Sequence, residues 1–441
     1  MRTVRTVISV LLILLSLALL AFAGFFLYSA LPKEGSTAKS QPTENLTLPQ
    51  ETPETADSTD AAAPEAPEEE APADAAEPEA PEEPADETTD AALDNHTARI
   101  QELLNAMTLD EKIWQLFITT PESLTGATTV TQAGDTTKTA LAEKPVGGLC
   151  YFAANLVDRA QTTAMLQATQ SYAKTGLFLS VDEEGGRVSR AGSNEAMGVT
   201  HFEAAAVYGQ RADMAEVYQV GSTLAAELGS LGFNVDFAPV ADVVTNPNNT
   251  EIGDRSYSSD PQVAAAMVSA MVDGLQRGGM VSCLKHFPGH GSTETDTHEG
   301  KSVSNRTVEE LQSCEWIPFQ SGIDKGVAMV MLSHLTNENL SALPSDLSPE
   351  VVSYLREDLG FGGIIVTDSH QMGAITNYYT SGEAAVLALQ AGVDMILMPM
   401  DLQAAFDGVK VAVEDGTLSE ARINESVTRI LAVKYSFGII S

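Results

Sequence analysis

Apolar runs recur through the C-terminal three quarters of the chain, and amphipathic segments separate them. The runs are continuously apolar rather than alternating, which is typical of parallel strands that are buried on both faces. Eight runs of this kind predict eight strands: Gln115–Thr119, Val146–Phe152, Phe178–Val181, Val235–Val240, Cys283–His286, Met329–Ser333, Ile364–Thr367 and Met395–Met398.

The segments between these runs have helical periodicity and helix-forming composition. The clearest are Asp158–Lys174, Met214–Leu231, Asp260–Arg277, Val308–Lys325, Ser348–Leu359 and Ser381–Ala391. Strands that alternate with helices in this way form parallel sheets, and eight such units form a closed barrel. The sequence therefore predicts an α/β fold, a (β/α)8 TIM-like barrel in a single catalytic domain.

Residues 1–32 have a different composition and predict a membrane anchor. Arg2 and Arg5 precede the apolar run Val7–Leu31, which is long enough to cross a bilayer as a helix. Basic residues before such a run favour a cytoplasmic N-terminus. Ala21-Phe22-Ala23 resembles a cleavage site, so a removable signal segment is the alternative. We expect an extracytoplasmic protein, anchored to the cell membrane by this helix or secreted if the segment is cleaved.

Residues 33–94 predict a disordered acidic linker rich in Ala, Pro and Glu. Residues 51–90 carry sixteen Asp and Glu and no Lys or Arg. Such a segment cannot bury enough apolar surface to offset the entropy of ordering it. The catalytic barrel is then expected over residues 95–441. The net charge of −37 argues against nucleic acid as a partner.

The three cysteines, Cys150, Cys283 and Cys314, lie in or beside apolar stretches without metal-ligand spacing. We expect buried free thiols, no disulfide framework, and no metal or other cofactor.

Ionisable residues follow several predicted strands at their C-terminal ends, where barrel enzymes build their active sites. The densest group is the segment Lys285–Gly291, followed closely by Asp296-Thr297-His298. Asp368 ends the seventh apolar run. An imidazole with its own carboxylate, plus a separate carboxylate, suits acid/base and nucleophilic chemistry on a neutral substrate.

These motifs resemble the β-N-acetylhexosaminidase branch of the family 3 glycoside hydrolases. That branch has a Lys-His-Phe-Pro-Gly-His-Gly segment and a downstream Asp-x-His, present here as Lys285–Gly291 and Asp296–His298. The Asp-x-Glu-Gly-Gly-Arg-Val segment is Asp182–Val188, and the Gly-Asp-Arg-Ser segment is Gly253–Ser256. The resemblance runs from Leu103 to the C-terminus.

The resemblance implies a retaining exo-β-N-acetylglucosaminidase that removes terminal N-acetylglucosamine from cell-wall fragments or other glycans. Asp368 would be the nucleophile, His298 the general acid/base, and Asp296 the residue that orients His298. The residues that bind the sugar would be Asp182, Arg190, Arg255, Lys285 and His286.

Two positions depart from the family pattern. Glu183 stands where Gln is common, and His370 stands where Leu is common. His370 is expected to hydrogen-bond a loop, with a place at the site entrance as the alternative. A β-glucosidase, a glycoside phosphorylase and an inactive wall-binding protein remain alternative functions.

Overall fold

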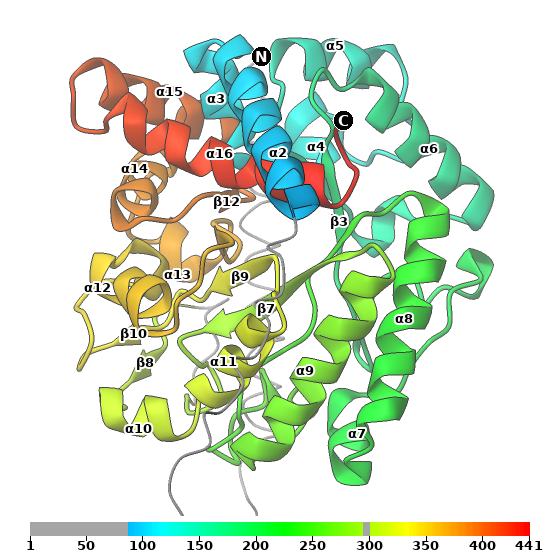
Figure 1. Cartoon of the computed structure of the whole chain (residues 1–441), viewed down its shortest axis with the longest axis vertical. Helices are drawn as coiled ribbons and strands as arrows, with labels where there is room; N and C mark the ends of the chain where they lie inside the picture. Colours follow the sequence, from blue (N-terminus) through cyan, green and yellow to red (C-terminus); the bar gives the residue numbers. More distant parts are fainter. Residues whose placement is uncertain (1–86, 294–299) are drawn as a thin grey trace, which may run out of the picture. The chain divides into compact units, whose positions relative to one another are not determined.

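The computed structural model describes residues 87–293 and 300–441 (Figure 1). The predicted anchor, nearly all of the predicted linker, and residues 294–299 lie outside these ranges. Within the described ranges, no helix has the length and apolar character needed to cross a membrane.

Eight parallel strands form the centre of the fold, as predicted. In sheet order they are β11 (Ile364–Thr367), β9 (Met329–Leu332), β7 (Val281–Phe287), β6 (Val235–Asp236), β3 (Phe178–Val181), β2 (Gly148–Cys150), β1 (Phe117–Thr119) and β12 (Ile396–Leu397). A parallel bridge between Val366 of β11 and Met395, the residue directly before β12, closes the barrel. Every predicted strand is confirmed, although the strands are mostly shorter than the apolar runs.

Helices surround the barrel, and several begin at a side chain that caps the first backbone N–H groups. Asp158, Asp213 and Asp260 accept such hydrogen bonds at three of these starts. The helices between strands include α5 (Asp135–Glu143), α6 (Arg159–Tyr172), α8 (Met214–Leu231), α9 (Pro261–Arg277), α10 (Val308–Ser313), α11 (Trp316–Asp324), α12 (Pro349–Ser353) and α14 (Ser381–Ala391). Helices α15 (Leu402–Glu414) and α16 (Glu420–Ser436) follow the last strand, β12. Helices α8 and α9 pack side by side (Figure 1).

The predicted single helix Val308–Lys325 is wrong, because the structure has two helices here, α10 and α11. The backbone of Cys314 leaves the helical region, with φ −142° and ψ −83°. Pro318 explains the break: a proline ring inside a helix clashes with the carbonyl four residues earlier, which here belongs to Cys314.

The first described helix, α2 (Glu87–Ala106), begins before the predicted domain boundary. Residues 87–94, which the sequence placed in the disordered linker, are therefore helical. The sequence of this segment explains the helix, because it contains Ala91, Ala92 and Leu93, and alanine and leucine have high helix propensity.

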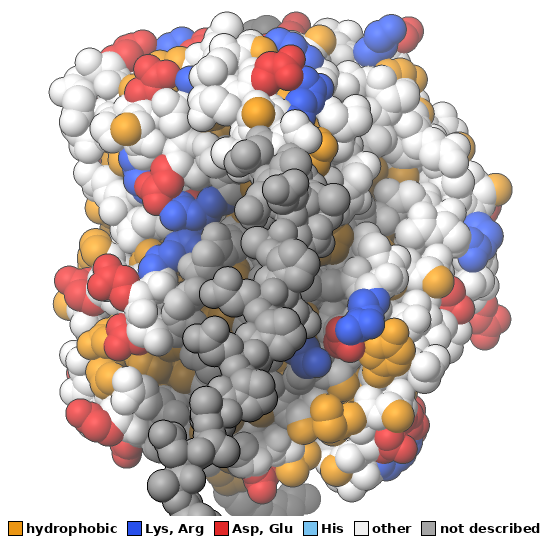
Figure 2. Space-filling model, in the orientation of Figure 1, with side chains coloured by type: hydrophobic (Ala, Val, Ile, Leu, Met, Phe, Trp, Pro, Cys, Tyr) orange, Lys and Arg blue, Asp and Glu red, His pale blue; other side chains and the backbone are white. Residues whose placement is uncertain are grey.

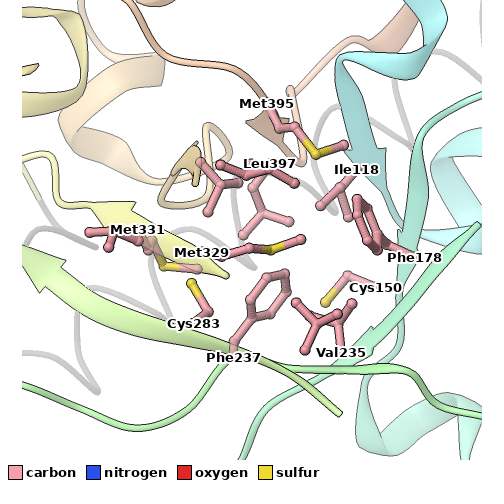
Figure 3. Close-up of a cluster of buried hydrophobic side chains, with 14 of the residues drawn as sticks. Ile118, Cys150, Phe178, Val235, Phe237, Cys283, Met329, Met331, Met395 and Leu397 are labelled. Carbon is pink, nitrogen blue, oxygen red and sulfur yellow. The ribbon is translucent and has the colours of Figure 1, made fainter. Parts of the chain in front are cut away.

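Apolar side chains fill the inside of the barrel (Figure 3). Phe178, Phe237 and Met329 lie among them and are at most 1% exposed. Cys150 and Cys283 project into the same cluster as buried free thiols, as predicted. Burial raises the pKa of both thiols, so neither is suited to act as a nucleophile. Cys314 is also a free thiol, but it is only partly buried, so the prediction of burial is wrong for this residue.

Two short sheets lie outside the barrel, among the loops at the C-terminal ends of the strands. The hairpin β4–β5 (Glu183–Gly185 and Val188–Ser189) follows β3. Strands β8 (Val303–Ser304) and β10 (Thr336–Asn337) pair in parallel and connect the loop after β7 with the loop after β9.

Candidate active site

A cavity of about 180 Å³ lies at the C-terminal ends of the barrel strands. Its lining brings together Asp368 and all five residues predicted to bind the sugar: Asp182, Arg190, Arg255, Lys285 and His286. Phe152, Met331, Met372 and Met398 also line the cavity and supply apolar surface. One pocket therefore joins residues that lie far apart in the sequence.

Glu184 is the centre of an ion-pair network in the cavity wall, and the sequence did not single it out as a site residue. Arg255 donates two hydrogen bonds to its carboxylate, from Nε at 2.8 Å and from Nη2 at 3.0 Å. Lys285 Nζ lies 2.5 Å from Glu184 Oε1 and 2.8 Å from Asp182 Oδ1. This network holds Lys285 and Arg255 in fixed positions.

The charges in this network stabilise each other. Burial raises the pKa of Glu184, but Lys285 and Arg255 outweigh that effect and hold this pKa well below its usual range. Burial lowers the pKa of Lys285, whereas Asp182 and Glu184 raise it above its usual range. Both cations and Glu184 therefore stay charged at neutral pH.

Arg190 lies beside the network and lines the outer part of the cavity. Its Nη2 lies 3.7 Å from Asp182 Oδ2, and its guanidinium lies over the ring of Phe152 at 5.7 Å from the centroid. The Arg190 side chain is 31% exposed. It therefore retains N–H groups that can bind a ligand.

Asp242 orients His286 and was not among the predicted site residues. Its Oδ2 lies 2.7 Å from His286 Nδ1, and its Oδ1 accepts the backbone N–H of His290 at 2.6 Å. Burial raises the pKa of Asp242, but the neighbouring histidines outweigh burial and lower it. The carboxylate thus fixes the His286 ring, whose Nε2 lies 3.3 Å from Arg255 Nη2.

Asp368 follows β11 directly and faces the cavity. The backbone N–H of Ser369 donates to Asp368 Oδ1 at 2.7 Å. Burial raises the pKa of Asp368, but His286 and His334 outweigh burial, and the pKa lies below its usual range. Asp368 is therefore an ionised carboxylate, as a nucleophile must be.

Asp296 and His298 lie outside the described residues, so their predicted roles stay predictions. The described residues stop at Thr293 and resume at Gly300. Thr293 is buried and its hydroxyl lies 3.0 Å from His290 Nδ1. The loop therefore starts at the wall of the cavity.

His334, Asp346 and His370 form a buried cluster behind Asp368. Their ligand-type atoms all lie within 4.8 Å of one another, so that they are close enough to hold a metal ion. His370 hydrogen-bonds Asp346 at 2.8 Å and is not part of the cavity lining. His370 thus forms a hydrogen bond, as predicted, but its partner lies in the short helix η4 (Ser345–Leu347) rather than in a loop. Nothing in the sequence indicated that Asp346 is the partner of His370.

An ionised aspartate and paired charges around one small cavity, at the C-terminal ends of the strands of a (β/α)8 barrel, form the arrangement that is typical of the active sites of barrel enzymes. The pattern of the family described as "Glycosyl hydrolase family 3 N terminal domain" matches residues 108–433. The chain belongs to glycosyl hydrolase family 3.

Relatives and solved structures agree with this assignment. Beta-hexosaminidase A of Pseudoalteromonas piscicida is 32% identical over 66% of this chain and 53% of its own length. Beta-hexosaminidase of Nitrosomonas eutropha is 34% identical over 62% of this chain and 78% of the relative. The family 3 β-N-acetylglucosaminidase of Paenibacillus sp. has a TM-score of 0.71 and 35% identity, covering 76% of this chain and 63% of that one. The chain thus spans about half the length of the first relative.

Proposed function

We propose that this protein is a retaining exo-β-N-acetylglucosaminidase. The observation that carries the proposal is the ionised Asp368 in the same cavity as the Asp182–Lys285 and Glu184–Arg255 pairs. Two of the relatives above are named β-hexosaminidases and one solved relative a β-N-acetylglucosaminidase. The small cavity suits one terminal sugar, which favours exo action.

In the first step, one oxygen of Asp368 forms a bond to the anomeric carbon as the glycosidic bond breaks. The leaving oxygen takes a proton from the imidazolium of His298, which Asp296 orients. In the second step, neutral His298 removes a proton from water, and this water releases the sugar from Asp368 with net retention.

The cavity wall binds and orients the sugar during both steps. Lys285, Arg255 and Arg190 supply N–H donors, and Asp182 supplies acceptors, for the hydroxyl groups of the terminal residue. Because Glu184 and Asp182 already neutralise the two inner cations, the pocket favours a neutral ligand over an anion. A cell-wall fragment or another glycan with terminal N-acetylglucosamine is the proposed substrate.

The test is hydrolysis of 4-nitrophenyl β-N-acetylglucosaminide compared with the corresponding glucoside. The proposal expects turnover of the first, a much lower kcat/KM for the second, and loss of turnover in Asp368→Ala. Preference for the glucoside, or full turnover by Asp368→Ala, would refute it. Formation of sugar 1-phosphate in phosphate buffer would show that the protein is a glycoside phosphorylase and not a hydrolase.

For the N-terminal part we propose a membrane anchor over residues 1–32 and an acidic tether up to the start of α2. The support is the apolar run after Arg2 and Arg5 and the acidic composition that follows. Recovery of the full-length protein in the membrane fraction, with release by proteolysis between residues 33 and 86, is the expected result. Full-length protein in the soluble fraction would contradict the anchor.

A further inference from the structure

A single buried carboxylate bridges two imidazoles behind Asp368. Asp346 lies in the short helix η4 (Ser345–Leu347), with Oδ2 2.8 Å from His370 Nε2 and Oδ1 3.1 Å from His334 Nδ1. The three side chains are at most 1% exposed. None of them lines the cavity, so none can touch a sugar bound there.

Hydrogen bonds connect this cluster to the nucleophile. His334 Nε2 lies 2.8 Å from the carbonyl oxygen of Ser369, and since a carbonyl only accepts, this nitrogen is the donor. The N–H of Ser369 donates in turn to Asp368 Oδ1. His370, the next residue, is held by its backbone N–H on the Leu397 carbonyl at 2.9 Å.

We infer that Asp346 is a positioning residue for Asp368, which it orients through His334 and Ser369. The His334 ring fixes the Ser369 peptide, and the Ser369 N–H occupies Oδ1, so that Oδ2 is the oxygen that bonds to the sugar. His370, which follows Ser369, is held by its own hydrogen bonds to Leu397 and Asp346 and so restrains the Ser369–His370 segment from its C-terminal side. This inference rests on the proposed function, because it gives the cluster a role in attack by Asp368.

Geometry favours this role over metal binding. A structural zinc site takes four protein ligands, and a catalytic one keeps an open position for water. The cluster offers three side chains that are closed to solvent, and Asp346 Oδ2 already accepts a hydrogen bond from His370. Asp346 forms a hydrogen bond with His370 and an ion pair with His334, and carboxylates orient imidazoles through contacts of this kind.

The first test is Asp346→Asn, which keeps the shape but removes the charge that both imidazoles share. Misplacement of a reacting group by about 1 Å can cost about 100-fold in rate. We expect kcat for the aryl N-acetylglucosaminide to fall by about 10- to 100-fold, while KM stays within about threefold. The rate of labelling by a 2-fluoro sugar should fall by the same factor.

The matched control is Asp394→Asn. Asp394 is also fully buried, and it pairs with Arg356, Arg422 and Arg429 just before β12, at the opposite end of the barrel. This substitution should lower Tm and leave kcat unchanged. If Asp346 only stabilised the fold, Asp346→Asn would show this same pattern, a lower Tm with an unchanged kcat.

A second pair of variants tests the hydrogen bond itself. His334→Gln keeps an N–H that can donate to the Ser369 carbonyl, whereas His334→Met has a similar volume and no donor. His334→Gln should retain several times more kcat than His334→Met. Equal losses in the two variants would overturn the inference.

Two other results would also overturn it: an unchanged kcat in Asp346→Asn, or one equivalent of zinc in the purified wild-type protein that Asp346→Asn lacks. Turnover by the wild type tests the proposed function, whereas the ratio of variant to wild-type kcat tests the positioning role. The two proposals can therefore fail separately.

Discussion

At the scale of single residues, charge pairing sets the electrostatics of the cavity wall. Lys285 and Arg255 would form an anion site if they were free, but Asp182 and Glu184 pair with them. The cations therefore present oriented N–H donors without a large net charge. The proposed ligand, a polar and uncharged sugar, fits this arrangement.

Glu184→Gln should lower the free energy of unfolding at pH 7 by about 3–5 kcal/mol, because it leaves two buried cations partly unpaired. Glu184 has a lowered pKa when folded, so its contribution is fully present above its unfolded pKa of about 4.3 and decreases as the pH falls below it. Urea unfolding of wild type and variant at pH 7 and pH 3 measures this. A stability difference that grows toward pH 3 would contradict the assignment.

His298→Ala tests the predicted acid/base. Without the acid, substrates with poor leaving groups should slow by about 100- to 10,000-fold, and activated aryl glycosides should slow much less, since they need little protonation. A series of aryl N-acetylglucosaminides of increasing leaving-group pKa measures the slope. An identical slope in wild type and variant would exclude His298 as the acid.

The sequence identified several residues that line the cavity, but it missed Glu184 in the cavity wall and the residues that hold the lining in place. Asp182, Lys285 and Asp368 could be found because each ends an apolar run, where barrel sites form. Asp346 lies 24 residues from His370, and Glu184 lies 71 residues from Arg255. No periodicity or spacing indicates such long-range pairs, which arise only when the barrel closes.

At the scale of elements, the loop after β7 is the best example of local sequence dictating shape. Gly289 has φ +124°, and a Cβ there would lie 2.7 Å from the Cβ of Glu315. The loop passes this close to the start of α11 because residue 289 has no side chain. The same loop leads to residues 294–299, which carry the predicted Asp296 and His298.

Gly289→Ala should therefore lower both Tm and kcat, because the loop must shift away from Glu315 and adopt a strained φ. A cost of about 1–3 kcal/mol is expected for such backbone strain. Gly362→Ala is the control, since its Cβ would meet no atom within 4 Å. The measurements are Tm from thermal unfolding and kcat for both variants. Equal changes in Gly289→Ala and Gly362→Ala would contradict the steric argument.

Element prediction succeeded where the local signal was strong. All eight strands were predicted because each is a continuous apolar run between helical segments. The break between α10 and α11 was missed although Pro318 indicated it. The start of α2 was missed because composition suggested disorder, whereas the residues from Glu87 onward favour a helix.

At the scale of the whole molecule, the folded unit and the acidic segment before it differ in charge pattern. On the face shown in Figure 2, acidic and basic side chains of the described residues are interspersed. Helix α2 is tied to the other end of the chain, because Arg99 donates to the backbone oxygen of Ser441 at 3.1 Å and 2.8 Å. We therefore expect residues 87–441 to be the catalytic unit.

A protein that starts at residue 87 should keep kcat and KM within about twofold of the full chain, because the cavity draws its lining from Cys150 to Met398. A protein that starts at residue 107 lacks α2 and should have a lower Tm, since it loses the packing of α2 on α16. Kinetics and thermal unfolding of both proteins test this. A large loss of activity on removing residues 1–86 would contradict it.

Trapping of the covalent intermediate tests the central claim most directly. The protein is incubated with a 2-fluoro sugar that carries a good leaving group, digested, and mapped by mass spectrometry. We expect one label per chain, attached to the side chain of Asp368. A label on any other residue would contradict the proposed mechanism.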